Sequence, residues 1–476
     1  MPDDVLRRIA GYPGSGGILR ATSTGMKGLV DASARSIHLR PHDGPSDLLA
    51  RLVCLREVKV DPCCGVECLG ELARSSAFGR LETLDISGCP WLVDLGALSG
   101  FVGLRSLDLL AFKIQDLAPL AGCTALQTLK MVNLRNVRSV APLSSLSDLR
   151  DLTLTNCCNF SDIAPLAGTA LQSLKLDGIS IEDISPLGAC TALKHLEFFD
   201  CPIRDLSVLA GVTSLRSLIL TNCDELVDVA PIAHLAGLQH LSLLGCRNVA
   251  EVGALAACTA LCHLDISFCP KIREVGALAA CTALQHLAMR RCHEIRDVGC
   301  LVSFPALRHL DLRRCYAIQD VGGITACCTA LRYLDLFHSC IRIVDVGFLA
   351  TCTALEHLVL SHCRMIRDIG GLARCTALKR LNLTSCEEIR DLGPLATCTA
   401  LEHLNLSACK EICDLGPLAA CTALRYLNLT HCSKIDDVGS LAACTALRHI
   451  VIVHCGEVKG TRSLISTCSI KSVQGL

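Results

Sequence analysis

The chain has 476 residues, a formal net charge of -1 and only 3% aromatic residues, so its core must be aliphatic. A balanced charge argues against an electrostatic nucleic-acid binder, and no apolar run approaches the ~18 residues that a membrane span needs. The N-terminus lacks the continuous apolar region of a secretory signal. We therefore expect a cytoplasmic protein, with the nucleus as a second location, and neither a nucleic-acid nor a membrane partner.

Residues 1–40 lie outside the repeat pattern that follows them, and they favour a small helical cap. Their apolar residues are spaced as in short helices, at Val5, Leu6 and Ile9, at Ile18 and Leu19, and at Met26, Leu29 and Val30.

The same stretch, PDDVLRRIA followed by ILRATSTGMKGLVDASARSIHL, is similar to the F-box motif. That motif opens with Leu-Pro-x-x-[Leu/Val] and Ile and closes with a Lys/Arg-x-Trp-x-x-Leu helix. The usual tryptophan is missing here, and GYPGSGG interrupts the middle. The resemblance implies docking to a Skp1-like adaptor through Pro2, Leu6, Ile9 and Leu19. The alternative is a plain N-terminal cap.

Residues 41–80 form a divergent entry to the repeats, because LREVKV keeps the strand spacing while CCGVECLGELARSSAFGR is longer than the regular return segment. Residues 81–469 contain 17 units of 22–24 residues, and three nearly identical units cover Leu378–Ala446. In each unit L-x-x-L-x-L places alternate leucines on one face of a short strand. Residues 470–476 begin a truncated last strand. A regular array predicts one continuous right-handed parallel solenoid.

The 34 cysteines follow the repeat, counted from the first leucine of each unit. One row lies in the CTA phrase, and a second row occupies position 9, at Cys89, Cys157, Cys201, Cys223, Cys246, Cys269, Cys292, Cys315, Cys363, Cys386, Cys409, Cys432 and Cys455. No C-x-x-C occurs, which removes the commonest zinc and redox spacing. We expect reduced, buried ladders, with a metal or disulfide role as the alternative.

An aspartate lies at or next to position 14 in 13 units, just before the segment that reads G-P-L-A or A-P-L-A in several of them, for example Asp391 and Asp414. A carboxylate there is placed to cap a short helical turn, and proline suits the first helical positions. The row therefore predicts a capping ladder rather than catalytic carboxylates. The chain also lacks G-x-x-x-x-G-K-[ST], H-E-x-x-H and G-x-S-x-G, so no residues support an enzyme.

The pattern L-x-x-L-x-L-x-x-C/N resembles the leucine-rich repeat family over residues 81–469. The cysteine at position 9 resembles the cysteine-containing type, D-[LVI]-x-P-L resembles internalin-type repeats, and CTALxHLxLxxC is similar to leucine-rich repeat proteins of trypanosomatid protozoa. This resemblance implies an α/β solenoid, a horseshoe with a parallel concave sheet and short helical or 3-10 turns on the convex side. It also implies non-enzymatic binding of a protein, without a cofactor.

The variable strand positions face the concave side. Position 3 carries a histidine row, at His195, His240, His263, His286, His309, His357, His403 and His449, with Tyr333, Arg380 and Tyr426 between them. Strands stack ~4.8 Å apart, so neighbouring imidazoles should resist joint protonation and stay mostly neutral at pH 7. The row is either a stacked polar surface or a site for a partner or metal.

Position 5 carries Asn382, Asn405 and Asn428, which we expect to form hydrogen bonds along the stack. Positions 7 and 8 hold a cluster that we interpret as a partner site. Its members are Arg290, Arg291, Arg313 and Arg314, with His286, His309, Phe337 and His338 beside them. Arginine and aromatic residues concentrate binding energy, so the cluster suits an acidic partner. Alternatively, it is a solvated surface partly neutralised by Asp311 and Asp335.

Two functions remain open at this point. The first is a recognition module that selects a substrate on its concave face, as the substrate receptor of an SCF-type ubiquitin ligase. The second is a cytosolic scaffold or regulatory subunit that holds an enzyme or a cytoskeletal protein.

Overall fold

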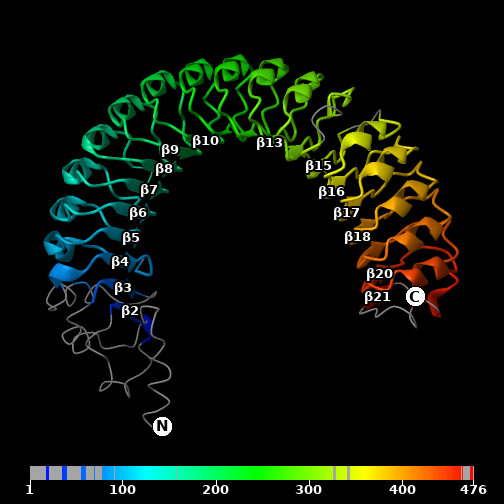
Figure 1. Cartoon of the computed structure of the whole chain (residues 1–476). Helices are drawn as coiled ribbons and strands as arrows, with labels where there is room; N and C mark the ends of the chain where they lie inside the picture. The colour runs from blue at the N-terminus through cyan, green and yellow to red at the C-terminus, as the bar shows by residue number, and fades with distance from the viewer. Residues whose placement is uncertain are drawn as a thin grey trace, which may run out of the picture. The chain divides into compact units, whose positions relative to one another are not determined.

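The computed structural model describes residues 18–20, 35–39, 55–60, 69, 78–89, 92–157, 159–324, 329–339, 343–462, 464 and 472–474. The chain divides into two compact units, Met1–Glu225 (unit 1) and Leu226–Leu476 (unit 2). In each unit, parallel strands line one side and 3-10 helices line the other (Figure 1).

In unit 1, each strand pairs in parallel with the next one along the chain, from β1–β2 to β9–β10. The strands are β1 (Ile18–Arg20), β2 (Ser36–Leu39), β3 (Glu57–Val60), β4 (Thr83–Ile86), β5 (Ser106–Leu110), β6 (Thr128–Val132), β7 (Asp151–Thr155), β8 (Ser173–Asp177), β9 (His195–Phe199) and β10 (Ser217–Thr221). The helices are η1 (Phe78–Arg80), η2 (Gly96–Gly100), η3 (Ala118–Gly122), η4 (Ala141–Ser145), η5 (Ala164–Gly168), η6 (Ser185–Ala189) and η7 (Ser207–Gly211).

Unit 2 repeats this arrangement, with parallel pairing from β11–β12 to β20–β21. Its strands are β11 (His240–Ser242), β12 (His263–Asp265), β13 (His286–Ala288), β14 (His309–Asp311), β15 (Tyr333–Asp335), β16 (His357–Val359), β17 (Arg380–Asn382), β18 (His403–Asn405), β19 (Tyr426–Asn428), β20 (His449–Val451) and β21 (Ser472–Gln474). Its helices are η8 (Ala230–His234), η9 (Gly253–Ala257), η10 (Gly276–Ala280), η11 (Gly299–Ser303), η12 (Gly347–Thr351), η13 (Gly370–Arg374), η14 (Gly393–Thr397), η15 (Gly416–Ala420) and η16 (Gly439–Ala443).

The leucine ladder of each repeat forms the core. In the repeat of β18, Leu401, Leu404 and Leu406 have no exposed surface, and Leu418 of η15 closes the core from the helical side. Strands pair in register, so Leu381, Leu404 and Leu427 form one continuous row. The predicted fold class, a leucine-rich repeat solenoid with a parallel sheet and 3-10 turns, is confirmed.

The aspartates at position 14 cap the helices as predicted, through a turn that begins one residue earlier than a standard N-cap. The Oδ1 atom of Asp391 accepts a hydrogen bond from the N–H of Gly393, the first residue of η14, at 2.7 Å. Asp414 caps Gly416 in the same way, and Asp94 caps Gly96 in unit 1. The carboxylate therefore satisfies a helical N–H that has no partner within the helix.

Both cysteine rows link successive repeats. At position 9, the thiol of Cys409 donates to the carbonyl of Leu383 at 3.1 Å, and the thiol of Cys432 donates to Leu406 at 3.0 Å. In the CTA row, Cys421 donates to Leu395 at 3.4 Å. Burial raises the pKa of Cys432 to about 12. Each thiol therefore serves as a small apolar group with one weak donor, which fits the predicted packing role.

Most described cysteines follow this rule. Among the free thiols in the described ranges, only Cys262, Cys413 and Cys455 are not buried. Cys352 differs, since it is disulfide-bonded. The expectation of an entirely reduced set therefore fails at this one described position.

The expected helix at Ile18 and Leu19 is wrong, because these residues lie in strand β1, which pairs with β2. Apolar residues two apart in SIHL continue the strand pattern of the repeats, so the sheet extends into residues 1–40. The other helical segments expected in residues 1–40 lie outside the described residues. In the described part of the chain, no helix is long and apolar enough to cross a membrane.

Candidate binding surface

A stack of aromatic rings runs along position 3 of unit 2. Ring centroids are 4.4 Å apart for His240 and His263, 5.6 Å for His263 and His286, and 4.0 Å for His286 and His309. Tyr333 continues the stack at 4.1 Å from His309, with ring planes 3° apart. Because the strands pair in register, one ring from each repeat faces the next.

Three imidazoles of the stack, His263, His286 and His309, are neutral at pH 7; the sequence predicted neutrality from repulsion between neighbours, but burial is the larger cause. Burial, followed by the charge of His286, lowers the pKa of His309 to about 4. Burial also lowers the pKa of His263 and of His286. Within the described ranges, no group of three or more His, Cys, Asp or Glu residues is placed to hold a metal ion.

Beside this stack, Arg290 and Arg313 alternate with three aspartates. Arg290 contacts Asp265 at 3.4 Å and Asp311 at 3.6 Å. Arg313 contacts Asp311 at 2.6 Å and Asp335 at 3.4 Å. The side chains of Asp311 and Asp335 are only 4% and 5% exposed. These two arginines therefore neutralise carboxylates that the sheet buries.

Arg291 and Arg314 point elsewhere, although they are adjacent in sequence to the first pair. The guanidinium of Arg291 lies 5.2 Å from the ring centre of Phe268, and that of Arg314 lies 5.6 Å from the ring of Phe337. Neither forms an ion pair with a carboxylate of the described residues. In the predicted four-arginine cluster, Arg290 and Arg313 are thus neutralised by aspartates, whereas Arg291 and Arg314 lie on aromatic rings without a carboxylate. Arg290 also lies 6.0 Å from the ring centre of Phe268.

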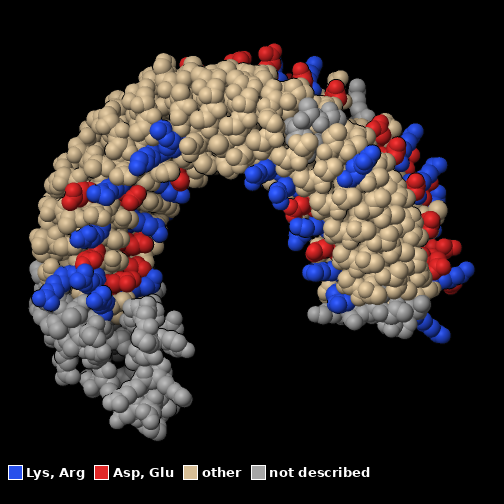
Figure 2. Space-filling view, in the orientation of Figure 1, with Lys and Arg blue, Asp and Glu red and all other residues tan. Residues whose placement is uncertain are grey.

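Backbone geometry causes this split. Residues at position 8 adopt a left-handed conformation with positive φ, between 50° and 75° in every repeat from Leu126 to Leu447. Five consecutive repeats of unit 2 place a large side chain at this position. We name these residues the left-handed row: Phe268, Arg291, Arg314, His338 and His362. A positive φ re-aims the side chain relative to position 7, so only the arginine at position 7 contacts the aspartates. Figure 2 shows Lys and Arg side chains, with acidic ones among them, on the strand side of unit 2.

Aromatic contacts extend the left-handed row. His338 and His362 stack at 5.4 Å between ring centroids, and Phe337 contacts His362 edge-on at 5.3 Å. Phe268 is 38% exposed. His286 and His309, which the sequence grouped with the arginines, lie in the ring stack of position 3 instead.

The asparagines at position 5 do not bond along the stack as expected. The Oδ1 atom of Asn382 accepts from the N–H of Thr384 at 3.0 Å and from its hydroxyl at 2.7 Å. Asn405 accepts from the N–H of Ser407 at 3.0 Å, and Asn428 accepts from Thr430. The short side chain reaches its own turn two residues ahead more easily than the next strand.

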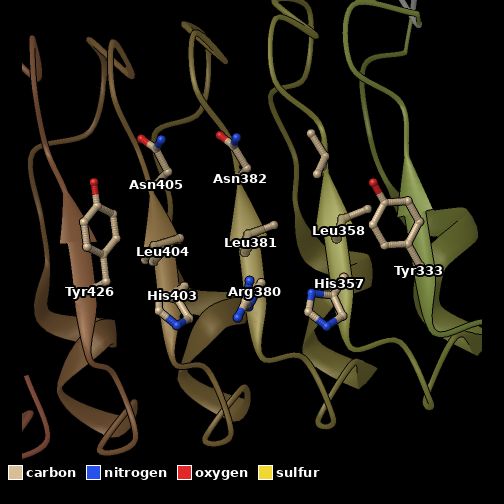
Figure 3. A pocket seen from close by; sticks show the side chains of 11 residues that line it. Tyr333, His357, Leu358, Arg380, Leu381, Asn382, His403, Leu404, Asn405 and Tyr426 are labelled. Atoms are coloured by element: carbon tan, nitrogen blue, oxygen red, sulfur yellow. The ribbon is translucent and has the colours of Figure 1, made fainter. Parts of the chain in front are cut away.

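A hollow of about 360 Å³ opens on the strand side between Tyr333 and Tyr426 (Figure 3). Strands β16, β17 and β18 line it with His357, Arg380, Asn382, His403 and Asn405. Here the ring row loosens, since centroids are 6.3 Å apart for Tyr333 and His357 and 6.1 Å for His403 and Tyr426. This hollow was not predicted from the sequence. The feature that could have indicated it is Arg380, the one non-aromatic side chain among the position-3 residues from His240 to His449.

Of the proposed adaptor-binding residues, Pro2, Leu6 and Ile9 lie outside the described residues. Leu19 lies in strand β1 rather than in a helix.

Comparisons with known proteins agree with the repeat geometry. The family description "Leucine Rich repeats (2 copies)" matches residues 353–397, and "Leucine Rich repeat" matches residues 420–442. No curated protein gives a significant sequence match.

Solved structures with a similar fold include the mouse RP105/MD-1 complex, with 19% identity over 93% of this chain and 77% of that chain at a TM-score of 0.56. The Leptospira interrogans LRR protein LIC12759 has 15% identity over 93% of this chain and 96% of its own, at a TM-score of 0.52. An internalin from Listeria monocytogenes has 22% identity over 71% of this chain and 83% of its own, at a TM-score of 0.42. Residues 353–397 and 420–442 are therefore leucine-rich repeats, and the described chain has the fold of a leucine-rich repeat solenoid.

Proposed function

We propose that the strand side of unit 2 binds an acidic protein partner without catalysing a reaction on it. The observation that carries this proposal is the left-handed row, where two arginines lie on aromatic rings and have no carboxylate partner among the described residues. Leucine-rich repeat proteins recognise other proteins, and the proposal for this chain adds that the partner is acidic.

The fold alone does not favour the large side chains of the left-handed row. A turn with positive φ at its third residue favours glycine or asparagine, and a larger side chain there costs about 1–2 kcal/mol. Unit 1 uses Asn133, Asn156, Gly178, Asp200 and Asn222 at the same position. Backbone strain of this kind clusters at functional sites, so the bulky residues of unit 2 favour a role beyond folding.

The chemistry of the left-handed row suits an interface. Arginine and aromatic residues are enriched where a few side chains carry most of the binding energy. Arg290 and Arg313 are neutralised by Asp265, Asp311 and Asp335, so the cations that remain for a partner are Arg291 and Arg314. An acidic surface gains charge-assisted hydrogen bonds from both.

Two hypotheses describe the role of the complex between this chain and its partner. As a substrate receptor of an SCF-type ubiquitin ligase, the chain would dock a Skp1-like adaptor through residues 1–40. As a cytoplasmic scaffold, it would hold its partner without that adaptor. Affinity purification with and without residues 1–40 separates them, because recovery of the adaptor only with the intact N-terminus supports the ligase.

The double variant Arg291→Glu/Arg314→Glu tests the binding proposal. Both side chains lie at the surface, so the fold should keep its melting temperature within a few degrees while capture of the partner from lysate is lost. The matched control is Arg296→Glu/Arg374→Glu, the same charge change at two exposed arginines of unit 2 that form no ion pair among the described residues. Partner capture that survives the first variant, or that both variants abolish equally, would contradict the proposal.

A further inference from the structure

The hollow between Tyr333 and Tyr426 contains one arginine and two asparagines whose donor groups have no acceptor among the described residues. Arg380 is exposed, and among the described residues no carboxylate lies within 4.0 Å of its guanidinium. The carboxylates of the flanking repeats already have partners. Glu356 contacts Arg332 and Lys379, both at 2.6 Å, and Glu402 contacts Arg425 at 3.7 Å.

The two carboxamides of the hollow are oriented by their own turns. The Oδ1 atoms of Asn382 and Asn405 accept hydrogen bonds from Thr384 and Ser407, respectively. Each amide therefore presents its NH2 group, with two N–H donors, on the strand side (Figure 3). No described group accepts from these NH2 groups.

The charge of the hollow is close to one positive unit. Arg380 is its only residue that is charged at neutral pH, and no Asp or Glu lines it. Burial, followed by the charge of Arg380, lowers the pKa of His357 and of His403, so both imidazoles are neutral at pH 7. A single negative charge balances this site, whereas a phosphate dianion would leave one charge unpaired.

The three donor residues lie on two adjacent strands. Neighbouring strands lie ~4.8 Å apart and residues two apart on one strand are separated by ~6.6 Å. Arg380 and Asn382 come from β17 and Asn405 from β18, and all three line the same hollow. The rings of Tyr333 and Tyr426 bound it at either end and supply apolar contact for methylene groups.

We propose that this hollow is a carboxylate-binding site that accepts an Asp or Glu side chain from an acidic segment of a protein partner. One oxygen of the carboxylate binds the guanidinium of Arg380, and the other accepts from Asn382 or Asn405. The inference rests on the proposed function and adds a second contact with the same partner. Arg291 belongs to the repeat of β13, and the hollow lies three to five strands further along, on β16 to β18. An extended acidic segment that runs across the strands would reach both.

The test uses the full chain and a hexaglutamate peptide that carries an uncharged dye, with binding followed by fluorescence anisotropy at low salt. Hexaglutamine and a hexaglutamine with one phosphoserine are the comparison peptides. We expect hexaglutamate to bind, hexaglutamine not to bind, and Arg380→Gln to weaken hexaglutamate binding at least tenfold, as loss of a charge-assisted hydrogen bond does. Arg380→Lys should restore part of the affinity.

A second variant removes the NH2 donors but keeps the turns that Asn382 and Asn405 cap. In Asn382→Asp/Asn405→Asp, each new carboxylate can cap its turn as Asp265 caps Ser267 and Asp335 caps Phe337, but the NH2 donors are lost and negative charge is added. Hexaglutamate binding should fall at least tenfold. Asn428→Asp, the same change just outside the hollow, should alter it less than twofold.

The outcomes separate this inference from the proposed function. Hexaglutamate binding that is insensitive to Arg380→Gln and to the double asparagine variant overturns the carboxylate site, even if Arg291→Glu/Arg314→Glu abolishes partner capture. Tighter binding of the phosphoserine peptide than of hexaglutamate overturns the choice of ligand. Binding that depends on Arg380 while partner capture survives the Arg291 and Arg314 changes supports the site and refutes the proposed function.

Discussion

The two units solve the same backbone problem with different side chains. From Leu126 onward both place a left-handed residue at position 8. Unit 1 uses residues that tolerate positive φ, whereas unit 2, after Gly245, places Phe268, Arg291, Arg314, His338 and His362 there, followed by Ser385, Ala408, His431 and His454. Both units pair charges across neighbouring strands, as Lys175 does with Glu197 at 3.4 Å and Arg290 with Asp265 at 3.4 Å. At position 8, however, unit 1 follows the preferences of the fold and unit 2 departs from them.

The comparison requires that the cores of the two units be equivalent. Leu152 in unit 1 and Leu404 in unit 2 occupy the same buried position, 1% and 0% exposed. Replacing either with Asp buries an unpaired carboxylate and should cost on the order of 3–5 kcal/mol. Urea denaturation measures the loss, and Leu404→Met is the volume-matched control. A wild-type midpoint for Leu404→Asp would refute its burial.

The strain at position 8 can be introduced into unit 1. Asn156, with φ of 54°, should tolerate glycine, whereas Asn156→Arg should destabilise the protein by about 1–2 kcal/mol, because a long side chain gains nothing there to offset the left-handed backbone. The comparison of both variants by chemical denaturation measures the cost. Equal stability of the arginine and glycine variants would show that a large side chain at position 8 does not strain the backbone.

The ring stack makes unit 2 sensitive to acid. The pKa of His309 is lowered to about 4, so the unfolded chain, with an ordinary value near 6.5, binds the proton more tightly. Stability is therefore fully present above pH 6.5 and falls as the pH drops from 6.5 toward 4. His309→Tyr keeps a stacked ring, as Tyr333 does, and should have a smaller loss of melting temperature between pH 7.5 and 5. A variant as acid-sensitive as the wild type would contradict this origin.

The thiol ladders should contribute the smallest effect. Ser339 occupies position 9 in one repeat and donates to the carbonyl of Leu312, as the cysteines do to theirs. Cys409→Ser should therefore keep the donor, whereas Cys409→Ala should lose about 0.5–1.5 kcal/mol. Thermal melts of both variants measure the difference. An alanine variant as stable as the serine variant would show that the thiol acts by packing alone.

The repeat made much of the fold predictable. Because every unit reuses one pattern, burial of Cys409, capping by Asp414 and alignment of His286 with His309 could all be predicted from position in the repeat. Residues that leave the pattern could not. Arg290 and Arg291 are neighbours in sequence, yet Arg290 contacts aspartates and Arg291, whose φ is positive, does not.

The hollow at Arg380 was equally hidden, because it depends on the tilt of Tyr333 and Tyr426 relative to the rings beside them. The strand β1 was missed because Ile18 and Leu19 fit a helix and a strand equally well in so short a run. Asn382 was misassigned because its side chain bonds to its own turn, a local contact that its ladder position does not reveal.

The central claim is that the left-handed row serves binding rather than folding, and one variant tests it directly. Phe268, Arg291, Arg314, His338 and His362 are all changed to Asn, the residue that unit 1 prefers, and capture of the partner is measured alongside the free energy of unfolding. Removing the strain of the left-handed backbone should stabilise the protein by about 1 kcal/mol per residue. This gain should outweigh the loss of exposed cation–π pairs, each worth about 0.5–1 kcal/mol. We predict a more stable protein that no longer captures its partner. A less stable protein that still captures it would contradict the account.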